Sequence, residues 1–273
     1  SEDIHKEGVS DPEWVAKGNI TSSVRGSTAQ STRGSGLNVS ASSSGVWTEV
    51  DNQNILVSGT LNTNWIKWDK TVTKHSGLQF IGKNGFIVDG EDEFELATLN
   101  HYNYPVNDAI ENAKLKVTIT LGAPINQTKD FNMDLTIDET LNKTPCPSWH
   151  TPGHPACDDK ITFPTVYSKE FFVVGDTKYV LEITGFIQGS HNVGQFITEE
   201  KKTNEAIIRG RLRSIPAKVT ICHASDSHSN PYITHTPSAN GHVDGHNGHN
   251  GPILYPGITE NWGDIIPEFR YFD

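Results

Sequence analysis

The chain has few cysteines, little positive charge and no long apolar run. Its 273 residues include three Cys and one Met, and 22 Lys and Arg are outnumbered by 33 Asp and Glu, which gives a formal net charge of −11. Three cysteines are too few for a disulfide scaffold. An acidic chain without clustered cations lacks what phosphate binding requires, so we expect no nucleic-acid partner. No stretch approaches the ~20 apolar residues of a membrane-spanning helix, so we also expect no membrane span.

What the chain does contain is typical of strands separated by turns. Between residues 46 and 214, short runs rich in Thr, Val, Ile and aromatic residues follow one another, and many alternate apolar with polar. In KLKVTITL, for example, Leu115, Val117 and Ile119 share one face while the intervening polar residues share the other. No window shows helical periodicity. The pattern predicts an all-β fold, an antiparallel β-sandwich that is jelly-roll-like.

The segments on either side of this region have a different composition. Residues 1–45 are rich in Ser, Gly and Thr and hold few apolar residues, which predicts a flexible segment or one that donates a strand to a neighbouring chain. Strand donation from copy to copy would build a head-to-tail fibre. Residues 215–273 are rich in His, Gly and Asn, which predicts a small loop-rich C-terminal module.

The cysteines suggest where the protein works. Cys146 and Cys157 flank the short loop CPSWHTPGHPAC, and we predict a disulfide between them, which requires an oxidising compartment. The chain begins SEDIHKEG without Met, as expected for a mature secreted chain whose leader has been removed. Cys222 is then left over, and it is either buried and inert, paired between chains, or a metal ligand.

Two resemblances point to bacterial surface proteins. The segments SSSGVWTEV, ILVSGTLNTNWIKW and above all ATLNHYNYPV resemble the bacterial choice-of-anchor K domain, over roughly residues 46–212. That resemblance implies an exported β-rich domain and no catalytic activity. Further on, the residues CHA, NPY, GHVDGHNGHN and DIIPEF resemble a short unit of bacterial surface proteins, with Glu268 in place of the usual second proline.

The C-terminal module also carries a candidate metal site. Residues 221–250 hold six of the chain's 12 histidines. Imidazole and thiolate are ligands that favour Zn or Cu over Ca and Mg. The predicted ligands are His223, His246 and His249, then Cys222 and His242, with a carboxylate from Asp264 or Asp244. The alternative is a solvated polar loop in which these residues serve turns.

Three further groups of residues have a site interpretation and a simpler one. His150 and His154, beside Trp149, form either a copper site or a surface loop, and the loop is favoured. His101 is expected to make a structural hydrogen bond. The acidic run DGEDEFE, residues 89–95, is a possible Ca²⁺ site, although a plain acidic loop is favoured.

No sequence motif of a common enzyme class is present, neither a nucleophile elbow nor a HExxH, phosphate-binding or dinucleotide-binding motif. The sequence therefore predicts a secreted, non-enzymatic structural or adhesive protein of the bacterial surface. Its partners would be copies of itself or other surface components, and a metal would stabilise its C-terminal module. Two alternatives remain, an extracellular copper-binding or acquisition protein and a zinc-dependent hydrolase.

Overall fold

The computed structural model describes residues 37–140, 142, 144–216, 218, 220–225, 227–236 and 261–265. The chain divides into two compact units. One consists of Gly36–Phe172 and Val180–Arg213, and the other includes residues 214–273. Each unit is described by itself.

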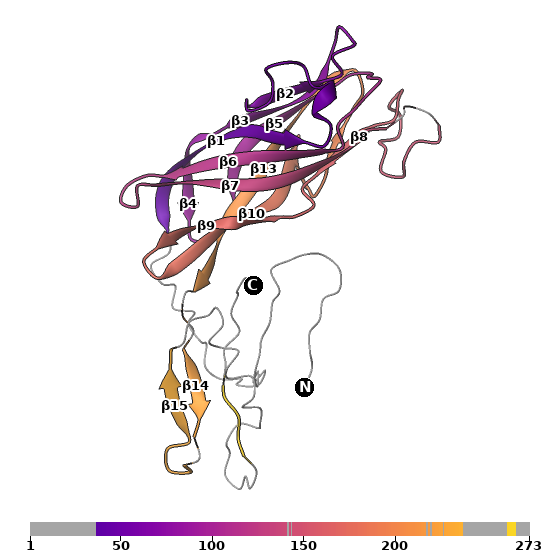
Figure 1. Ribbon diagram of the computed structural model, residues 1–273. Helices are drawn as coiled ribbons and strands as arrows, with labels where there is room; N and C mark the ends of the chain where they lie inside the picture. Colours follow the sequence, from indigo (N-terminus) through magenta and orange to yellow (C-terminus); the bar gives the residue numbers. More distant parts are fainter. Residues whose placement is uncertain are drawn as a thin grey trace. The chain divides into compact units, whose positions relative to one another are not determined.

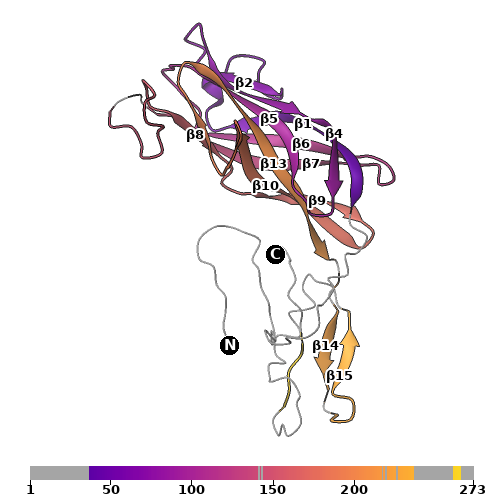
Figure 2. The ribbon, with the colours of Figure 1, turned by 180° about the vertical axis from the view of Figure 1, so that it is seen from behind.

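The first unit is an all-β sandwich of two antiparallel sheets (Figures 1 and 2). The six-stranded sheet has the order β12 (Phe196–Thr198), β8 (Asp159–Thr162), β7 (Gln127–Asp138), β6 (Asn112–Leu121), β1 (Asn38–Val50) and β4 (Asn84–Asp89). The seven-stranded sheet has the order β11 (His191–Val193), β10 (Thr177–Gln188), β13 (Lys202–Pro216), β5 (Phe94–Asn103), β3 (Ser76–Gly82) and β2 (Trp65–Trp68), and β9 (Tyr167–Val174) pairs with β10. A short 3-10 helix, Gln53–Ile55, precedes β2. The predicted fold class is confirmed.

The predicted alternation fills the space between the sheets. Along β6, Leu115, Val117, Ile119 and Leu121 are all buried, while the intervening Lys and Thr residues face outward or are half-buried. Large side chains from both sheets complete the core, including Trp47, Trp68 and Phe131, none of which is exposed. Burial of this apolar surface is the main favourable term in folding the sandwich.

The sandwich begins earlier than the sequence analysis expected. Residues 38–45, which were assigned to the N-terminal segment, form the first half of β1 and pair with both β4 and β6 inside the six-stranded sheet. The inward residues Ser43 and Gly45 are small where the opposite sheet approaches closely. A Cβ on Gly45 would lie 2.7 Å from the ring of Phe80. The composition of this segment predicts flexibility, but its small residues are the ones that such close packing requires.

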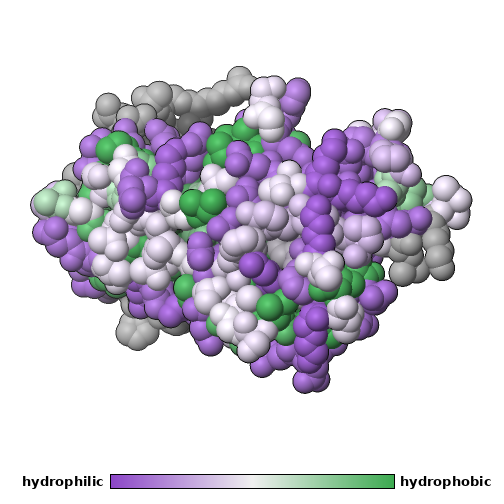
Figure 3. All heavy atoms as spheres, turned by 90° about the horizontal axis from the view of Figure 1, so that it is seen from above, coloured by the Kyte–Doolittle hydropathy of each residue, from purple (hydrophilic) through white to green (hydrophobic). Residues whose placement is uncertain are grey.

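Figure 3 shows the molecule from above the view of Figure 1. The surface on this side is mostly hydrophilic, and its apolar residues form small separate groups. Among the described residues the large exposed apolar side chains are Ile81, Ile87, Val173 and Ile233. No helix within the described ranges has the length and apolar character needed to span a bilayer.

The second unit contains a two-stranded antiparallel hairpin, β14 (Ile221–Ala224) and β15 (Tyr232–His235). A further backbone bridge joins Cys222 to Ile265, with hydrogen bonds in both directions. The strand β14 covers the residues ICHA.

Candidate metal centre

A group of buried polar residues lies between the two sheets of the sandwich. His101 comes from β5 of the seven-stranded sheet, whereas Glu139 follows β7 and Asp159 begins β8, both in the six-stranded sheet. One ligand atom from each of the three residues lies within 4.8 Å of the other two. His101 and Asp159 are fully buried and Glu139 is half-buried. We call this group, with Asn103 and Glu200, the interior cluster.

The ring of His101 is held in one orientation. It stacks on Trp68 with 5.9 Å between ring centroids, and its Nδ1 lies 2.9 Å from Oγ1 of Thr198. The Thr198 hydroxyl donates its own proton to the carbonyl of Asp159, at 3.4 Å, so it accepts from Nδ1–H of His101. Nε2 of His101 therefore carries a lone pair, and this buried atom has no hydrogen-bond partner among the described residues. The expected structural hydrogen bond of His101 is present, but it uses only one of the two ring nitrogens.

The two remaining members supply oxygen atoms. The amide nitrogen of Asn103 donates to the carbonyl of Thr198, at 3.3 Å, which leaves Oδ1 of Asn103 buried without a partner within the described part of the chain. Glu200 is 4 % exposed and accepts a hydrogen bond from Asn142 on one carboxylate oxygen, while its buried Oε1 has no hydrogen-bond partner among the residues that the structure describes. One carboxylate oxygen of Glu139 and one of Asp159 are likewise buried without a hydrogen-bond partner among the described residues.

Burial changes the proton affinity of these groups. Burial, together with the negative charges of Asp159 and Glu200, raises the pKa of Glu139 to about 9. Burial also raises the pKa of Asp159 to about 7, against the backbone N–H of Thr140, which donates to its Oδ1 at 2.8 Å. Burial lowers the pKa of His101 to about 3, so the imidazole is neutral at physiological pH.

Such an arrangement is costly without a counter-charge. Unpaired buried carboxylates and amide oxygens lose their hydration, and each such atom costs about 1–3 kcal/mol or more when it stays unpaired. A neutral imidazole nitrogen and two carboxylate oxygens within 4.8 Å of one another are donors that suit a divalent metal ion. Sequence reasoning missed this set because its members are separated by up to 99 residues, from 101 to 200, and none lies in a recognisable spacing motif.

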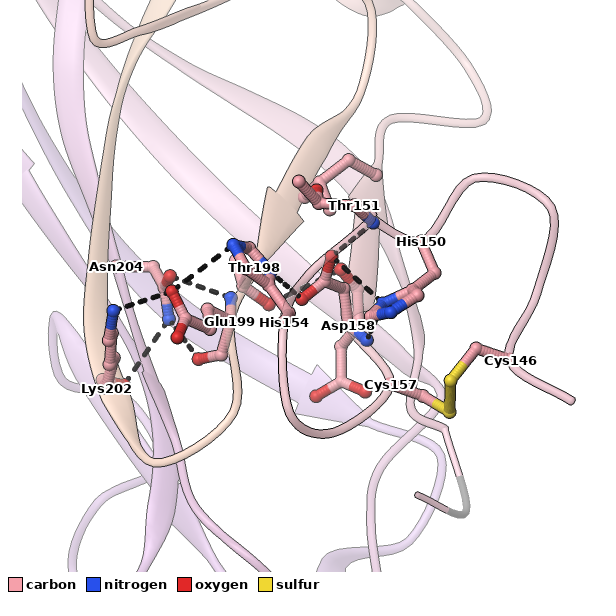
Figure 4. A network of polar contacts seen from close by, with 12 residues as sticks. Cys146, His150, Thr151, His154, Cys157, Asp158, Thr198, Glu199, Lys202 and Asn204 are labelled. Carbon is pink, nitrogen blue, oxygen red and sulfur yellow. Dashed lines mark hydrogen bonds and ion pairs between the residues drawn. A yellow bond between two sulfur atoms is a disulfide. The ribbon is translucent and has the colours of Figure 1, made fainter. Parts of the chain in front are cut away.

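The predicted disulfide is present beside this cluster (Figure 4). Cys146 and Cys157 are joined, with 2.06 Å between the sulfur atoms. Directly after the closed loop, Asp158 is fully buried and accepts from the backbone N–H of Thr151, at 2.7 Å, and from His154 Nδ1, at 2.6 Å. His150 Nδ1 accepts from the backbone N–H of Asp158. The two histidines thus make hydrogen bonds within the loop, as the favoured loop interpretation requires.

In the C-terminal unit the structure brings two of the predicted ligands together. Nδ1 of His223 lies 3.0 Å from Oδ1 and 3.1 Å from Oδ2 of Asp264, and the backbone N–H of Ala224 donates to Oδ1 of Asp264 at 2.7 Å. His235, which sequence reasoning did not select, lies edge-on to His223 with 5.4 Å between ring centroids. Cys222 is next to His223 on β14, so the two side chains point to opposite faces of the strand.

Other predicted ligands lie outside the described residues, namely His242, Asp244, His246 and His249. The acidic run at residues 89–95 is described. There Glu91 pairs with Arg213, at 2.7 Å, and Glu93 pairs with Arg209. Glu95 pairs with Lys83. These carboxylates have protein cations as partners, which favours the acidic loop over the Ca²⁺ site.

No protein-family model matches the chain, and a search of curated proteins finds no match. The resemblance to the choice-of-anchor K domain and to the C-terminal surface unit therefore stays a prediction. The interior cluster has to be interpreted from its own geometry.

Proposed function

We propose that this protein is an exported, non-enzymatic protein of the bacterial surface whose β-sandwich is held together by one divalent transition-metal ion. One observation carries the metal part of the proposal, the five buried donor atoms that have no hydrogen-bond partner among the described residues. They are His101 Nε2, Asn103 Oδ1, Glu139 Oε2, Asp159 Oδ2 and Glu200 Oε1.

The donor set indicates which metal fits. It contains one imidazole, three carboxylates and an amide oxygen, with no sulfur. Copper(I) prefers thiolate and thioether ligands, and Ca²⁺ prefers an all-oxygen set. Mn²⁺ and Zn²⁺ accept both imidazole nitrogen and carboxylate oxygen, so we propose one of these two. A divalent ion would neutralise most of the negative charge that otherwise opposes burial of the three carboxylates.

The proposed role of the ion is structural. His101 and Asn103 belong to the seven-stranded sheet, whereas Asp159 belongs to the six-stranded sheet and Glu139 directly follows its strand β7. An ion bound by all of them would join the sheets at one end of the sandwich. Export is supported by the disulfide, which forms and persists in oxidising compartments. The structural or adhesive role at the cell surface rests on the resemblances.

Metal analysis of matched variants tests the proposal. Asp159 and Asp264 are both fully buried aspartates, one in each unit. We expect about one Mn²⁺ or Zn²⁺ per chain in protein purified without an affinity tag, and a lower melting temperature after dialysis against a chelator. Asp159→Asn should abolish binding, and Asp264→Asn should retain it. The proposal would be refuted if the wild-type protein bound neither ion at micromolar concentration and if the chelator did not change its melting temperature.

A second candidate is the extracellular metal-binding or acquisition protein predicted from the His-rich stretch. It is favoured by the hydrogen bond between His223 and Asp264, because metal-binding histidines usually donate their second ring nitrogen to a carboxylate. The same two variants separate the candidates. Metal that persists in Asp159→Asn and is lost in Asp264→Asn would move the site to the C-terminal unit.

A further inference from the structure

The disulfide-closed loop ends where the interior cluster begins. Cys157, Asp158 and Asp159 are consecutive, and Asp159 is the first residue of β8. Both aspartates are fully buried, but they have different partners. Asp158 accepts hydrogen bonds from Thr151 and His154 of the loop. Asp159 contributes to the interior cluster an oxygen that has no partner among the described residues. Any movement of the loop's end would therefore move a proposed metal ligand.

Thr140 connects the disulfide to the same ligand. Its hydroxyl donates to the carbonyl of Cys157, at 3.2 Å, and its backbone N–H donates to Oδ1 of Asp159, at 2.8 Å. Thr140 also directly follows Glu139, the second carboxylate of the cluster. Thr140 thus links the disulfide to two of the five proposed donors, Asp159 by a hydrogen bond and Glu139 along the chain.

The loop also reaches the segment that carries a third carboxylate. Nε2 of His154 lies 3.5 Å from the carboxylate of Glu199, the residue before Glu200. In Figure 4 the side chain of His154 lies between Asp158 and Glu199. The Glu199 backbone N–H is held in turn by Asn204, at 2.8 Å. The loop therefore contacts two of the chain segments that bring carboxylates to the cluster, 158–159 and 199–200.

We infer that the Cys146–Cys157 disulfide and Asp158 are positioning elements of the metal centre, so that metal binding and disulfide formation stabilise each other. The inference rests on the proposed function. Groups that hold ligands in place typically change metal affinity by about 10–100-fold when they are removed. Coupling between two binding equilibria is reciprocal, so bound metal should shift the disulfide equilibrium by the same factor. The protein would then load its ion tightly only after reaching an oxidising compartment.

The redox step is ordinary thiol–disulfide exchange. Dithiothreitol serves as the reductant, and its two thiols are oxidised to a cyclic disulfide. The two electrons and two protons pass to the protein, where the Cys146–Cys157 bond is broken and two thiols form. Metal binding changes no oxidation state in this scheme.

The first test measures affinity for Mn²⁺ and Zn²⁺ by competition with a chromophoric chelator. We compare the oxidised wild type, the Cys146→Ser/Cys157→Ser double variant and Asp158→Asn, with Ser190→Ala on an exposed turn as the control. The double variant and Asp158→Asn should bind each ion about 10–100-fold more weakly, and the control should bind normally. Equal affinity in folded double-variant and wild-type protein would overturn the inference. Failure of the oxidised wild type to bind either ion would instead refute the proposed function.

A second test uses only the wild-type protein, which covers the case in which the variants do not fold. The disulfide is equilibrated with mixtures of reduced and oxidised dithiothreitol, with and without Mn²⁺, since thiols bind Zn²⁺ themselves. Mn²⁺ should shift the midpoint toward the disulfide by about 10–100-fold in equilibrium constant. Reoxidation of the reduced protein should restore its Mn²⁺ affinity. A Mn²⁺-binding protein with an unchanged midpoint would show that the loop is merely a fold element.

Discussion

The interior cluster of the sandwich and the His-rich C-terminal stretch differ in how visible they are in the sequence. The stretch from residue 221 to residue 250 holds six histidines, whereas the interior cluster holds one, His101. Yet, within the described part of the chain, the interior cluster contains five buried donor atoms that have no hydrogen-bond partner. In the C-terminal unit, His223 and Asp264 are instead partners of each other. Density of ligand types along a chain is thus a weaker guide to a site than buried donors without partners.

The largest expected effect is on the pH dependence of the metal-free sandwich. The folded pKa of Glu139, about 9, and that of Asp159, about 7, both lie above the ordinary values for these residues. The stability that each contributes is present below pH ~4 and is lost as the pH rises through the folded pKa. His101 acts in the opposite sense, because its folded pKa, about 3, lies below the ordinary value. The stability that it contributes is lost as the pH falls from about 6.5 toward 3. The two carboxyls together outweigh His101 above about pH 4.5, so these three groups make the metal-free protein most stable near pH 4.

Urea unfolding in the presence of a chelator measures this at about pH 5, 7 and 9. The unfolding midpoint should fall steadily over this range, and saturating Mn²⁺ or Zn²⁺ should reverse the trend, since metal binding displaces the protons. A flat midpoint in chelator would contradict raised pKa values in the interior cluster. Asp264→Asn serves as the control, because its change lies in the other unit and should leave the slope with pH unaltered.

Next in size is the effect of Glu139→Gln, which should have opposite signs with and without metal. Loss of one ligand should weaken Mn²⁺ or Zn²⁺ binding by about 100-fold, or about 2.8 kcal/mol. In chelator at pH 9 the same change should raise the unfolding midpoint, because it removes a buried charge. Chelator competition and urea unfolding measure the two effects. Destabilisation under both conditions would indicate that Glu139 serves packing and not metal binding.

Gly45→Val tests the close approach of the two sheets. The new side chain would enter the space occupied by the ring of Phe80, since a Cβ there already lies 2.7 Å away. We expect a loss of about 1–3 kcal/mol in the free energy of unfolding, with or without metal. Val46→Thr, on the half-buried outward position next along β1, is the matched control and should cost much less. Equal effects at the two positions would mean that the sheets can separate there.

The smallest effect is expected in the C-terminal unit. Asp264→Asn should weaken the hydrogen bonds from Ala224 and His223, at a local cost of about 1–2 kcal/mol. Hydrogen exchange at the Ala224 amide should accelerate, while amides of the buried strands β6 and β7 should keep their protection. Slower exchange at Ala224, or faster exchange throughout the sandwich, would contradict a local role for Asp264.

Local pattern was sufficient for much of the fold. The two-residue alternation in segments such as 115–121 predicts half-buried strands, and the structure shows them as β6 in an antiparallel sandwich. The short Pro-rich loop between Cys146 and Cys157 likewise predicts its own disulfide, because the two cysteines are only eleven positions apart along the chain. These features depend on residues that are near one another in sequence, which is why the sequence by itself determined them.

Tertiary structure decided the first strand and the interior cluster. Residues 38–45 read as a flexible segment because their side chains are small and polar, and only the closeness of Phe80 explains why β1 needs them. His101, Glu139 and Asp159 come from three strand ends on two sheets, so pairing of distant strands sets their distances. Their unusual pKa values arise from burial, a property of the packed sandwich that no stretch of sequence carries alone.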